Sequence, residues 1–276
     1  MPRPPPGAAP GGRAGLQLPD LSPGQAAQGV GGGPSVSAER IDRDRLPAHV
    51  GIIMDGNGRW AAQRDEPRHV GHSAGEAALF DTVEGALELG LRYLTVYAFS
   101  TENWKRPPTE VRFLMNFNRD LLLRRADELD ERQVRVRFIG RRGRPVPRRL
   151  VDMIERTEAR TARHRRLTLQ VAFNYGGRAE LVDAARAIAR DAAAGTLKPD
   201  RVSAKSVQAR LYEPEAPDVD LLVRTSGEQR TSNFLLWEAA YAELVFTDVL
   251  WPDFDRRELF SAVRRYQDRA RRFGRV

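Results

Sequence analysis

Four segments of this 276-residue chain combine polar side chains with arginine, and each follows directly on an apolar run. They are residues 55–60, 100–106, 174–178 and 224–233. Three of them also contain glycines, which let backbone N–H groups close on an anion, and an arginine guanidinium can bind two phosphate oxygens at once. The composition of these segments therefore indicates chemistry on phosphorylated small molecules.

The first segment has the residue types of a metal-assisted phosphate site. Asp55 stands next to Gly56, Asn57, Gly58 and Arg59. Mg²⁺ typically takes one or two carboxylates and completes its shell with phosphate oxygens and water, so Asp55 is suited to hold it. The same residues also fit an ordinary turn in which the aspartate caps a helix.

The segment 224–233 resembles a second diphosphate cradle, formed by Arg224, Arg230 and Ser232. No GxxxxGK[ST] motif occurs, and Gly56-Asn57-Gly58 lacks the third glycine of a dinucleotide fingerprint. Two phosphate-sized sites, one carboxylate for magnesium and no nucleotide motif predict a transfer between two phosphorylated small molecules. Independent surface loops are the alternative.

Alternating strands and helices position these segments. Apolar runs predict strands at residues 50–54, 93–99, 134–139, 167–173, 219–224 and 244–246. Helical spacing, with prolines or glycines at several ends, predicts helices at residues 73–89, 110–132, 147–164, 178–194, 202–211, 234–240 and 255–272. The alternation predicts an α/β fold, a single domain with a largely parallel central sheet of about six strands flanked by helices. In such sheets ligands bind beyond the carboxyl ends of the strands.

The first 37 residues hold nine of the 23 glycines and eight of the 18 prolines, with almost no large apolar side chains. We therefore predict a disordered Gly/Pro-rich tail over residues 1–38 and a catalytic domain over residues 39–276. The chain has no cysteine, which excludes disulfides and thiolate chemistry. The longest apolar stretch, residues 234–246, is interrupted by glutamates and is shorter than a membrane span, and the N-terminus lacks the apolar core of a signal peptide. We expect a cytoplasmic protein.

The net charge of +8 comes almost entirely from arginine, because only three of the 45 basic side chains are lysines. A basic RNA-binding protein is one interpretation. The sequence lacks the aromatic-and-glycine strand motifs of common RNA-binding modules, so no nucleic-acid partner is expected.

The segment Gly71-His72-Ser73-Ala74-Gly75 fits the nucleophile elbow of α/β-hydrolases. That elbow must follow a strand, whereas the preceding residues are charged and contain Pro67.

Read in order, the polar segments and their flanks resemble the cis-prenyltransferase family, whose bacterial members include undecaprenyl diphosphate synthase. The matching blocks are His-Val-Gly-Ile-Ile-Met-Asp-Gly-Asn-Gly-Arg-Trp at residues 49–60, Arg68 with Gly71 and His72, Tyr-Ala-Phe-Ser-Thr-Glu-Asn-Trp at 97–104 with Arg106, Phe-Asn-Tyr-Gly-Gly-Arg at 173–178, and Ser-Asn-Phe-Leu-Leu-Trp at 232–237 with the run 242–254. The similarity covers about residues 46–274.

The resemblance implies a Mg²⁺-dependent prenyltransferase that condenses isopentenyl diphosphate with an allylic diphosphate. Asp55 matches the family's magnesium-binding aspartate, and Asn103 matches the residue that assists proton removal. The implied substrate-binding residues are Gly56, Asn57, Gly58, Arg59, Trp60, Arg68 and His72 for the allylic diphosphate, Ser100, Thr101, Glu102, Trp104 and Arg106 near the reacting carbons, and Arg224, Arg230, Thr231 and Ser232 for isopentenyl diphosphate.

The resemblance also implies a homodimer. Glu243 matches a second metal carboxylate contributed near the dimer interface, and Arg272 and Gly274 match a C-terminal Arg-x-Gly that reaches the partner's active site. The implied product is a (poly)cis-prenyl diphosphate, the carrier-lipid precursor for cell-wall synthesis, so peripheral membrane contact through the product is expected.

The chain departs from the family where Arg-Thr is usually followed by Gly-Gly-Glu-His, because it has Ser226-Gly227-Glu228-Gln229. The missing histidine is one of the metal-site groups that the resemblance implies. A non-catalytic partner subunit of the same fold is the rival interpretation, but it would be expected to lose the aspartate and the arginines. A growing chain also needs an apolar tunnel, whose expected walls are Leu79, Val83, Leu87, Leu114, Phe117, Leu121 and Leu122, with the small Ala98 leaving it open.

Overall fold

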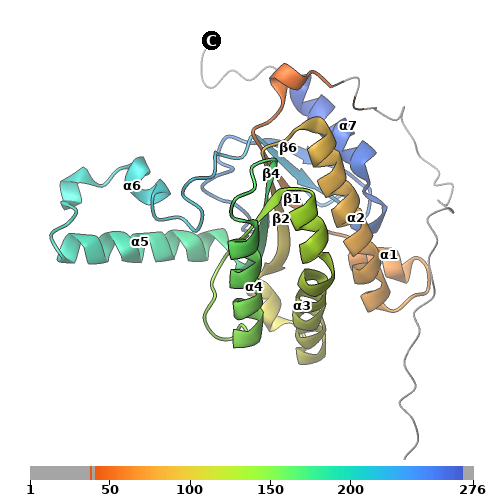
Figure 1. Ribbon diagram of the computed structural model, residues 1–276, viewed down its shortest axis with the longest axis horizontal. Coiled ribbons are helices and arrows are strands. Elements are labelled where there is room, and N and C mark those ends of the chain that lie inside the picture. The colour runs from red at the N-terminus through yellow and green to blue at the C-terminus, as the bar shows by residue number, and fades with distance from the viewer. Residues whose placement is uncertain (1–37, 39–40, 270–276) are drawn as a thin grey trace, which may run out of the picture. The chain divides into compact units, whose positions relative to one another are not determined.

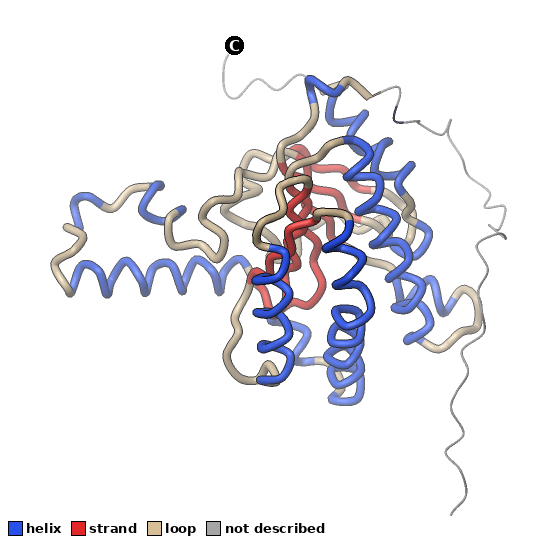
Figure 2. The backbone as a smooth tube through the Cα atoms, viewed as in Figure 1, coloured by secondary structure: helices blue, strands red, loops and turns tan. Residues whose placement is uncertain are grey.

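The computed structural model describes residue 38 and residues 41–269, apart from the side chains of residues 118–120, 122 and 123. Its core is a six-stranded sheet with the order β3-β4-β2-β1-β5-β6 (Figures 1 and 2). All five pairings are parallel, which confirms the predicted α/β fold. The predicted tail falls outside the described residues, except for Ala38.

The strands lie close to their predicted positions. They are β1 (His49–Ile53), β2 (Tyr93–Ser100), β3 (Val134–Ile139), β4 (Leu167–Tyr175), β5 (Leu221–Arg224) and β6 (Glu243–Phe246). The α-helices are α1 (Asn57–Ala62), α2 (Arg68–Leu89), α3 (Pro108–Glu131), α4 (Arg148–Thr161), α5 (Gly177–Ala193), α6 (Ala204–Gln208) and α7 (Arg256–Gln267). A 3-10 turn, Thr101–Lys105, follows β2.

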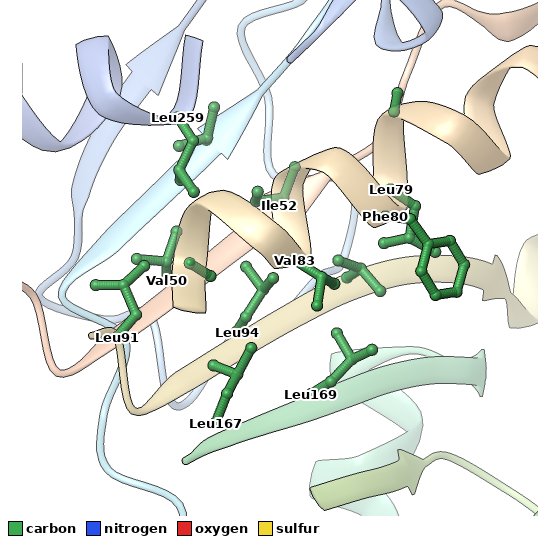
Figure 3. Packing of buried hydrophobic residues seen from close by; sticks show 14 of the residues in the cluster. Val50, Ile52, Leu79, Phe80, Val83, Leu91, Leu94, Leu167, Leu169 and Leu259 are labelled. Carbon is green, nitrogen blue, oxygen red and sulfur yellow. The ribbon is translucent and has the colours of Figure 1, made fainter. Parts of the chain in front are cut away.

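The two faces of the sheet carry different covers, because successive side chains of a strand point to opposite sides. Val50 and Ile52 of β1 pack with α2, α3, α4 and α7 in the larger apolar cluster. In Figure 3, Leu79, Phe80 and Val83 project from α2 toward the strands, and Leu259 projects from α7 toward the same face of the sheet. Ile53 belongs to the smaller cluster on the opposite face, which is covered by the chain between residues 211 and 242.

Local sequence signals explain where the helices on the first face begin and end. Gly90 adopts a left-handed conformation (φ 84°) and caps the end of α2, as glycine commonly does. α3 starts at Pro108, where a proline fits because the first N–H of a helix needs no intrahelical partner.

The predicted helix over residues 234–240 is wrong, because this segment forms a series of turns. Ser232, Asn233 and Leu235 have positive φ values of 50°, 65° and 46°, which a right-handed helix does not allow. Phe234 and Leu235 are nevertheless buried, so the apolar run reflects burial under the sheet rather than helical spacing. No helix in the described part of the chain is long and apolar enough to span a bilayer.

Candidate active site

A cavity of about 1000 Å³ opens beyond the carboxyl ends of the strands and continues between α2, α3 and the sheet. We call its outer part the mouth. Fourteen of the residues predicted from the sequence line it: Asp55, Gly56, Asn57, Gly58, Arg59, Arg68, His72, Ser100, Glu102, Asn103, Arg106, Arg224, Arg230 and Ser232. The structure therefore brings three of the four polar segments together around one space.

Asp55 lies at the centre of the mouth, two residues beyond the end of β1. Its Oδ2 accepts a hydrogen bond of 2.8 Å from Arg224 Nη2 and lies 3.6 Å from Arg59 Nη2. Burial alone would raise the pKa of Asp55, but the hydrogen bond and charge of Arg224, with the charge of Arg59, outweigh burial and lower it. Asp55 is therefore an ionised carboxylate at neutral pH.

Arg224 connects the end of β5 to the loop that follows it. This side chain is only 5% exposed, and its Nη1 donates to the Ser232 hydroxyl and to the Arg230 carbonyl oxygen, each at 2.6 Å. Its Nε is buried without a hydrogen-bond partner among the described residues. A buried guanidinium that holds both the loop and Asp55 fixes the mouth before any ligand enters.

Arg59 projects from α1 toward the same loop. It donates to the Ser226 carbonyl oxygen at 2.9 Å and to the Ser226 hydroxyl at 2.5 Å, and it lies 3.4 Å from Glu228. Ser226 has a left-handed backbone (φ 74°), which turns the loop back toward Arg59. Ser226 was not among the predicted site residues, because a serine in a polar loop carries no distinguishing signal.

The segment after β2 forms the opposite side of the mouth. Asn103 Oδ1 accepts from the Ser100 backbone N–H at 2.9 Å, which completes a capping box and fixes the turn. Glu102 Oε1 accepts from Asn233 Nδ2 at 2.9 Å, and the Asn233 Oδ1 accepts from the Arg178 N–H at 2.8 Å. Asn233, which the sequence analysis also missed as a site residue, thus ties this segment to the fourth one.

The side of the mouth formed by α2 and α3 carries two arginines around one glutamate. Glu110 of α3 accepts from Arg106 at 2.7 Å and lies 3.5 Å from Arg68. His72, one turn beyond Arg68, packs against Phe113 and Phe117. Burial, followed by the charges of Arg68 and Arg106, lowers the pKa of His72 to about 4, so its imidazole is neutral at neutral pH.

Several predicted residues lie near the cavity without lining it. Trp60 Nε1 donates to Asp253 at 2.7 Å, and Trp104 Nε1 donates to Asn174 at 2.8 Å. Thr101 and Thr231 also stand outside the lining. Gln229 is exposed on the loop after β5 and does not line the cavity. Arg272 and Gly274 lie outside the described residues.

Glu243 lies far from Asp55 within one chain. Ile53, Arg224 and Phe246 share one level of the sheet. Glu243 lies three residues, roughly 10 Å, before that level, whereas Asp55 lies beyond it. Its carboxylate pairs with Arg269 at 2.7 Å. The described residues contain no group of three or more histidines, aspartates or glutamates arranged to hold a metal ion. Of the two carboxylates predicted to hold the metal ion, only Asp55 therefore lies at the mouth within the described residues of one chain.

The inner half of the cavity is mainly apolar. Five of the expected tunnel walls line it: Leu79, Ala98, Leu114, Phe117 and Leu121. Val83 and Leu87 do not, because they are packed in the core instead, and the side chain of Leu122 lies outside the description. Further apolar walls that the sequence did not distinguish from core are Phe80, Val96, Leu129, Val136, Phe138, Leu169 and Val171.

The apparent nucleophile elbow is part of α2, and the structure explains its glycines. Ser73 donates back to the His69 carbonyl oxygen, as helical serines do. A Cβ on Gly71 would lie 2.0 Å from the Asn57 carbonyl oxygen, and one on Gly75 would lie 2.4 Å from Asn57 Oδ1. The two glycines allow α1 to approach α2 closely, which places Asn57 and Gly58 at the mouth.

The fold and the cavity define an α/β protein with arginines and a carboxylate at its strand ends beside an apolar space. Residues 53–274 match the family model described as "Putative undecaprenyl diphosphate synthase". The chain therefore belongs to this prenyltransferase family, which confirms the resemblance drawn from the sequence blocks.

Individual relatives agree with this membership. A trans,polycis-polyprenyl diphosphate synthase of Thermobifida fusca, specific for (2Z,6E)-farnesyl diphosphate, is 58% identical over 235 residues, which cover 85% of this chain and 83% of that protein. Decaprenyl diphosphate synthase of Mycobacterium tuberculosis is 53% identical, over 84% and 78% of the two chains. The crystal structure of lavandulyl diphosphate synthase from Lavandula x intermedia with dimethylallyl diphosphate matches with a TM-score of 0.80 and 36% identity, covering 83% and 98%.

Proposed function

We propose that this protein condenses isopentenyl diphosphate with an allylic diphosphate and releases a (poly)cis-prenyl diphosphate, the precursor of a carrier lipid for cell-wall synthesis. The observation that carries the proposal is the single cavity with two chemically different halves. Its charged mouth suits two diphosphates, and its apolar inner half suits a growing hydrocarbon chain.

Two groups of side chains divide the mouth between the substrates. Arg59, Arg68 and the α1 backbone around Gly58 face the space for the allylic diphosphate. Arg224, Arg230 and Ser232 bind isopentenyl diphosphate on the other side. Positioning both reactants in contact lowers the barrier by ~7–11 kcal/mol in well-oriented systems. The double bond of isopentenyl diphosphate attacks the allylic carbon as the allylic diphosphate departs, and loss of one proton leaves the new double bond.

The mouth also fits a magnesium ion. Asp55 is ionised, and the buried Asn57 Oδ1 and His72 Nε2 lack hydrogen-bond partners among the described residues, as expected of a site completed by a ligand. A single carboxylate suits Mg²⁺ that takes its remaining ligands from diphosphate and water. Bound there, the ion would supply positive charge for the departing diphosphate.

Asn103 is the proposed helper in proton removal. Its Oδ1 is engaged by the Ser100 backbone, so the amide is held in one orientation at the cavity wall. Its free amide hydrogens can then orient a diphosphate oxygen or a water that accepts the proton. The homodimer, with Glu243, Arg272 and Gly274 contributing near a partner's site, the membrane contact through the product and the cytoplasmic location remain predictions.

A non-catalytic subunit of the same fold would not need this constellation, yet the carboxylate and all the mouth arginines are present and aimed at one space. The test is an incubation with labelled isopentenyl diphosphate, Mg²⁺ and allylic starters of several lengths. We expect labelled products extended by five-carbon units. No incorporation with any starter, from protein that melts cooperatively, would overturn the proposal.

A further inference from the structure

A charged pair, Arg125 of α3 and Glu76 of α2, interrupts the apolar wall of the inner cavity. α3 lines this space with Phe117, Leu121, Arg125 and Leu129, which are spaced one helical turn apart and so share a face. Among the α3 residues from 114 onward whose side chains the structure describes, Arg125 is the only charged one that lines the cavity. The proposed function gives this arginine no role.

Arg125 is held in place by three contacts. Its Nε donates to Glu76 Oε1 of α2 at 3.1 Å, and its Nη1 donates to Glu128 at 2.7 Å. Its guanidinium carbon lies 4.4 Å from the centre of the Phe80 ring, within the range of a cation–π contact. Glu76 and Phe80 also line the cavity, so the ion pair spans the wall from α3 to α2.

The position of Arg125 along the cavity follows from the direction of α3. This helix begins beside the mouth after Arg106 and ends before β3 starts at the opposite edge of the sheet. Arg125 is therefore deeper than Leu121. Beyond it lie Leu129 of α3 and Leu169 of β4, and the latter faces α2 in Figure 3.

The free energy gained by burying a hydrocarbon chain differs along the inner cavity. A chain segment packed against Leu121 gains the ordinary benefit of apolar burial. A segment packed against Arg125 must displace water from a charged pair, which offsets that benefit even when the charges stay paired. Each added isoprene unit is thus stabilised until the tail reaches Arg125, where further extension is penalised.

We propose that Arg125, fixed by Glu76 and Phe80, is a specificity-determining residue that sets the length of the main product. The proposal rests on the proposed function, since it assumes that the inner cavity receives the growing prenyl chain. Leu129 is about 6 Å beyond Arg125 along α3, so removing the charge opens space for about one further isoprene unit or more.

The main test compares Arg125→Met with Arg124→Met. Arg124 is the adjacent residue, binds the same Glu76 at 2.6 Å and does not line the cavity, so it controls for the loss of an ion pair. Products made from labelled isopentenyl diphosphate and one fixed starter are separated by chain length. We expect Arg125→Met to shift the main product upward by at least one five-carbon unit, while Arg124→Met and Arg125→Lys keep the wild-type length.

An unchanged or shorter product from Arg125→Met would overturn the proposal, as would an equal shift in Arg124→Met. If Arg125→Met does not fold, Arg125→Gln removes the charge with a polar side chain and is judged by the same criterion. A second measurement needs no turnover: calorimetric titration with polyprenyl monophosphates of increasing length.

In the wild type, we expect the affinity for these monophosphates to stop rising once the tail reaches Arg125. In Arg125→Met the limit should move to a longer tail, and identical limits would overturn the role of Arg125. If the wild type makes no product but the limit still moves, the proposed reaction fails, while Arg125 still limits the length of the tail that the cavity binds.

Discussion

The mouth and the inner half of the cavity are built on opposite principles. In the mouth, charged groups are fixed by one another: buried Arg224 holds Asp55 and Ser232, and Arg59 holds Ser226. In the inner half, apart from the Arg125–Glu76 pair, the wall is formed by apolar side chains such as Leu114 and Phe117. The difference separates two tasks, because a fixed charged site suits the reaction and an apolar space suits a chain of changing length.

The same difference decides what can be predicted from sequence. A charged or polar residue at a strand end has few structural reasons to be there, so Asp55, Arg59 and Arg224 stand out and do lie together. An apolar residue on a helix has the same sequence pattern whether it faces a core or a cavity. Val83 and Leu79 are one turn apart on α2 and belong to the same buried cluster, yet only Leu79 also lines the cavity.

Two features needed three-dimensional information for other reasons. The segment 234–240 has a helical pattern, but left-handed residues such as Leu235 break it. Glu243 matches the family's metal carboxylate, yet the parallel register places it at the amino edge of the sheet, away from Asp55. Sequence fixes neither backbone handedness at a non-glycine residue nor the distance between strands that are far apart along the chain.

The largest loss of activity is expected from a substitution in the mouth of the cavity, at Asp55. Asp55→Ala should lower kcat for condensation by at least ~100-fold, because a ligand of a catalytic ion contributes several kcal/mol. Initial rates with saturating substrates and Mg²⁺ measure it. Asp55→Asn, which can still accept from Arg224, controls for the loss of that partner. Turnover within tenfold of wild type in a folded variant would remove Asp55 from the mechanism.

A second prediction concerns two neutral histidines, one in the wall of the mouth and one in the core. His49 is 1% exposed, with Nδ1 2.8 Å from the Pro217 carbonyl oxygen and Nε2 2.6 Å from the Thr95 hydroxyl. Burial lowers the pKa of His49 to about 4, against its ordinary value of 6.5. As the pH falls, the imidazole of His49 is therefore protonated in the unfolded chain at a higher pH than in the folded protein.

Stability should consequently be full above pH 6.5 and decline between pH 6.5 and about 4. The contribution of His49 between pH 6.5 and 5 is about 2 kcal/mol. Urea unfolding of the wild type and of His49→Gln at both pH values isolates this contribution. The same loss of unfolding free energy between pH 6.5 and 5 in both proteins would contradict the prediction.

The histidine in the wall of the mouth should respond to a ligand, whereas the core histidine should not. Inorganic diphosphate should raise the pKa of His72, beside Arg68 and Arg106, and leave that of His49 unchanged in an NMR titration.

A smaller change is expected when the inner half alone is altered. Ala98 of β2 lines the cavity, and Ala98→Leu fills part of it. We expect a shorter main product with the rate of the first condensation within about threefold of wild type, because the mouth is untouched. Product chromatography with a single short starter measures both. Loss of the first condensation instead would show that the two halves are not independent.

The smallest effect on activity and stability is expected from deleting the N-terminal segment up to residue 37. Residues 1–37 carry few apolar side chains, so their removal should change neither turnover nor melting temperature by more than the error of measurement. Ala38 packs against the larger cluster, Ile41 is 6% exposed, and Gln267 of α7 donates to the Asp42 carbonyl oxygen at 2.6 Å.

Extending the deletion through residue 45 should therefore cost stability, because it removes the buried Ile41 and the hydrogen bonds of Asp42 and Arg45 with Gln267 of α7. Ile41→Ala in the full chain isolates the apolar part of that cost, which we expect at about 2–4 kcal/mol. Differential scanning calorimetry of the two deletions and of Ile41→Ala measures all three. A melting temperature lowered by several degrees in the 1–37 deletion would show that the segment contacts the catalytic domain. An unchanged melting temperature in Ile41→Ala would show that the packing of the Ile41 side chain contributes little to stability.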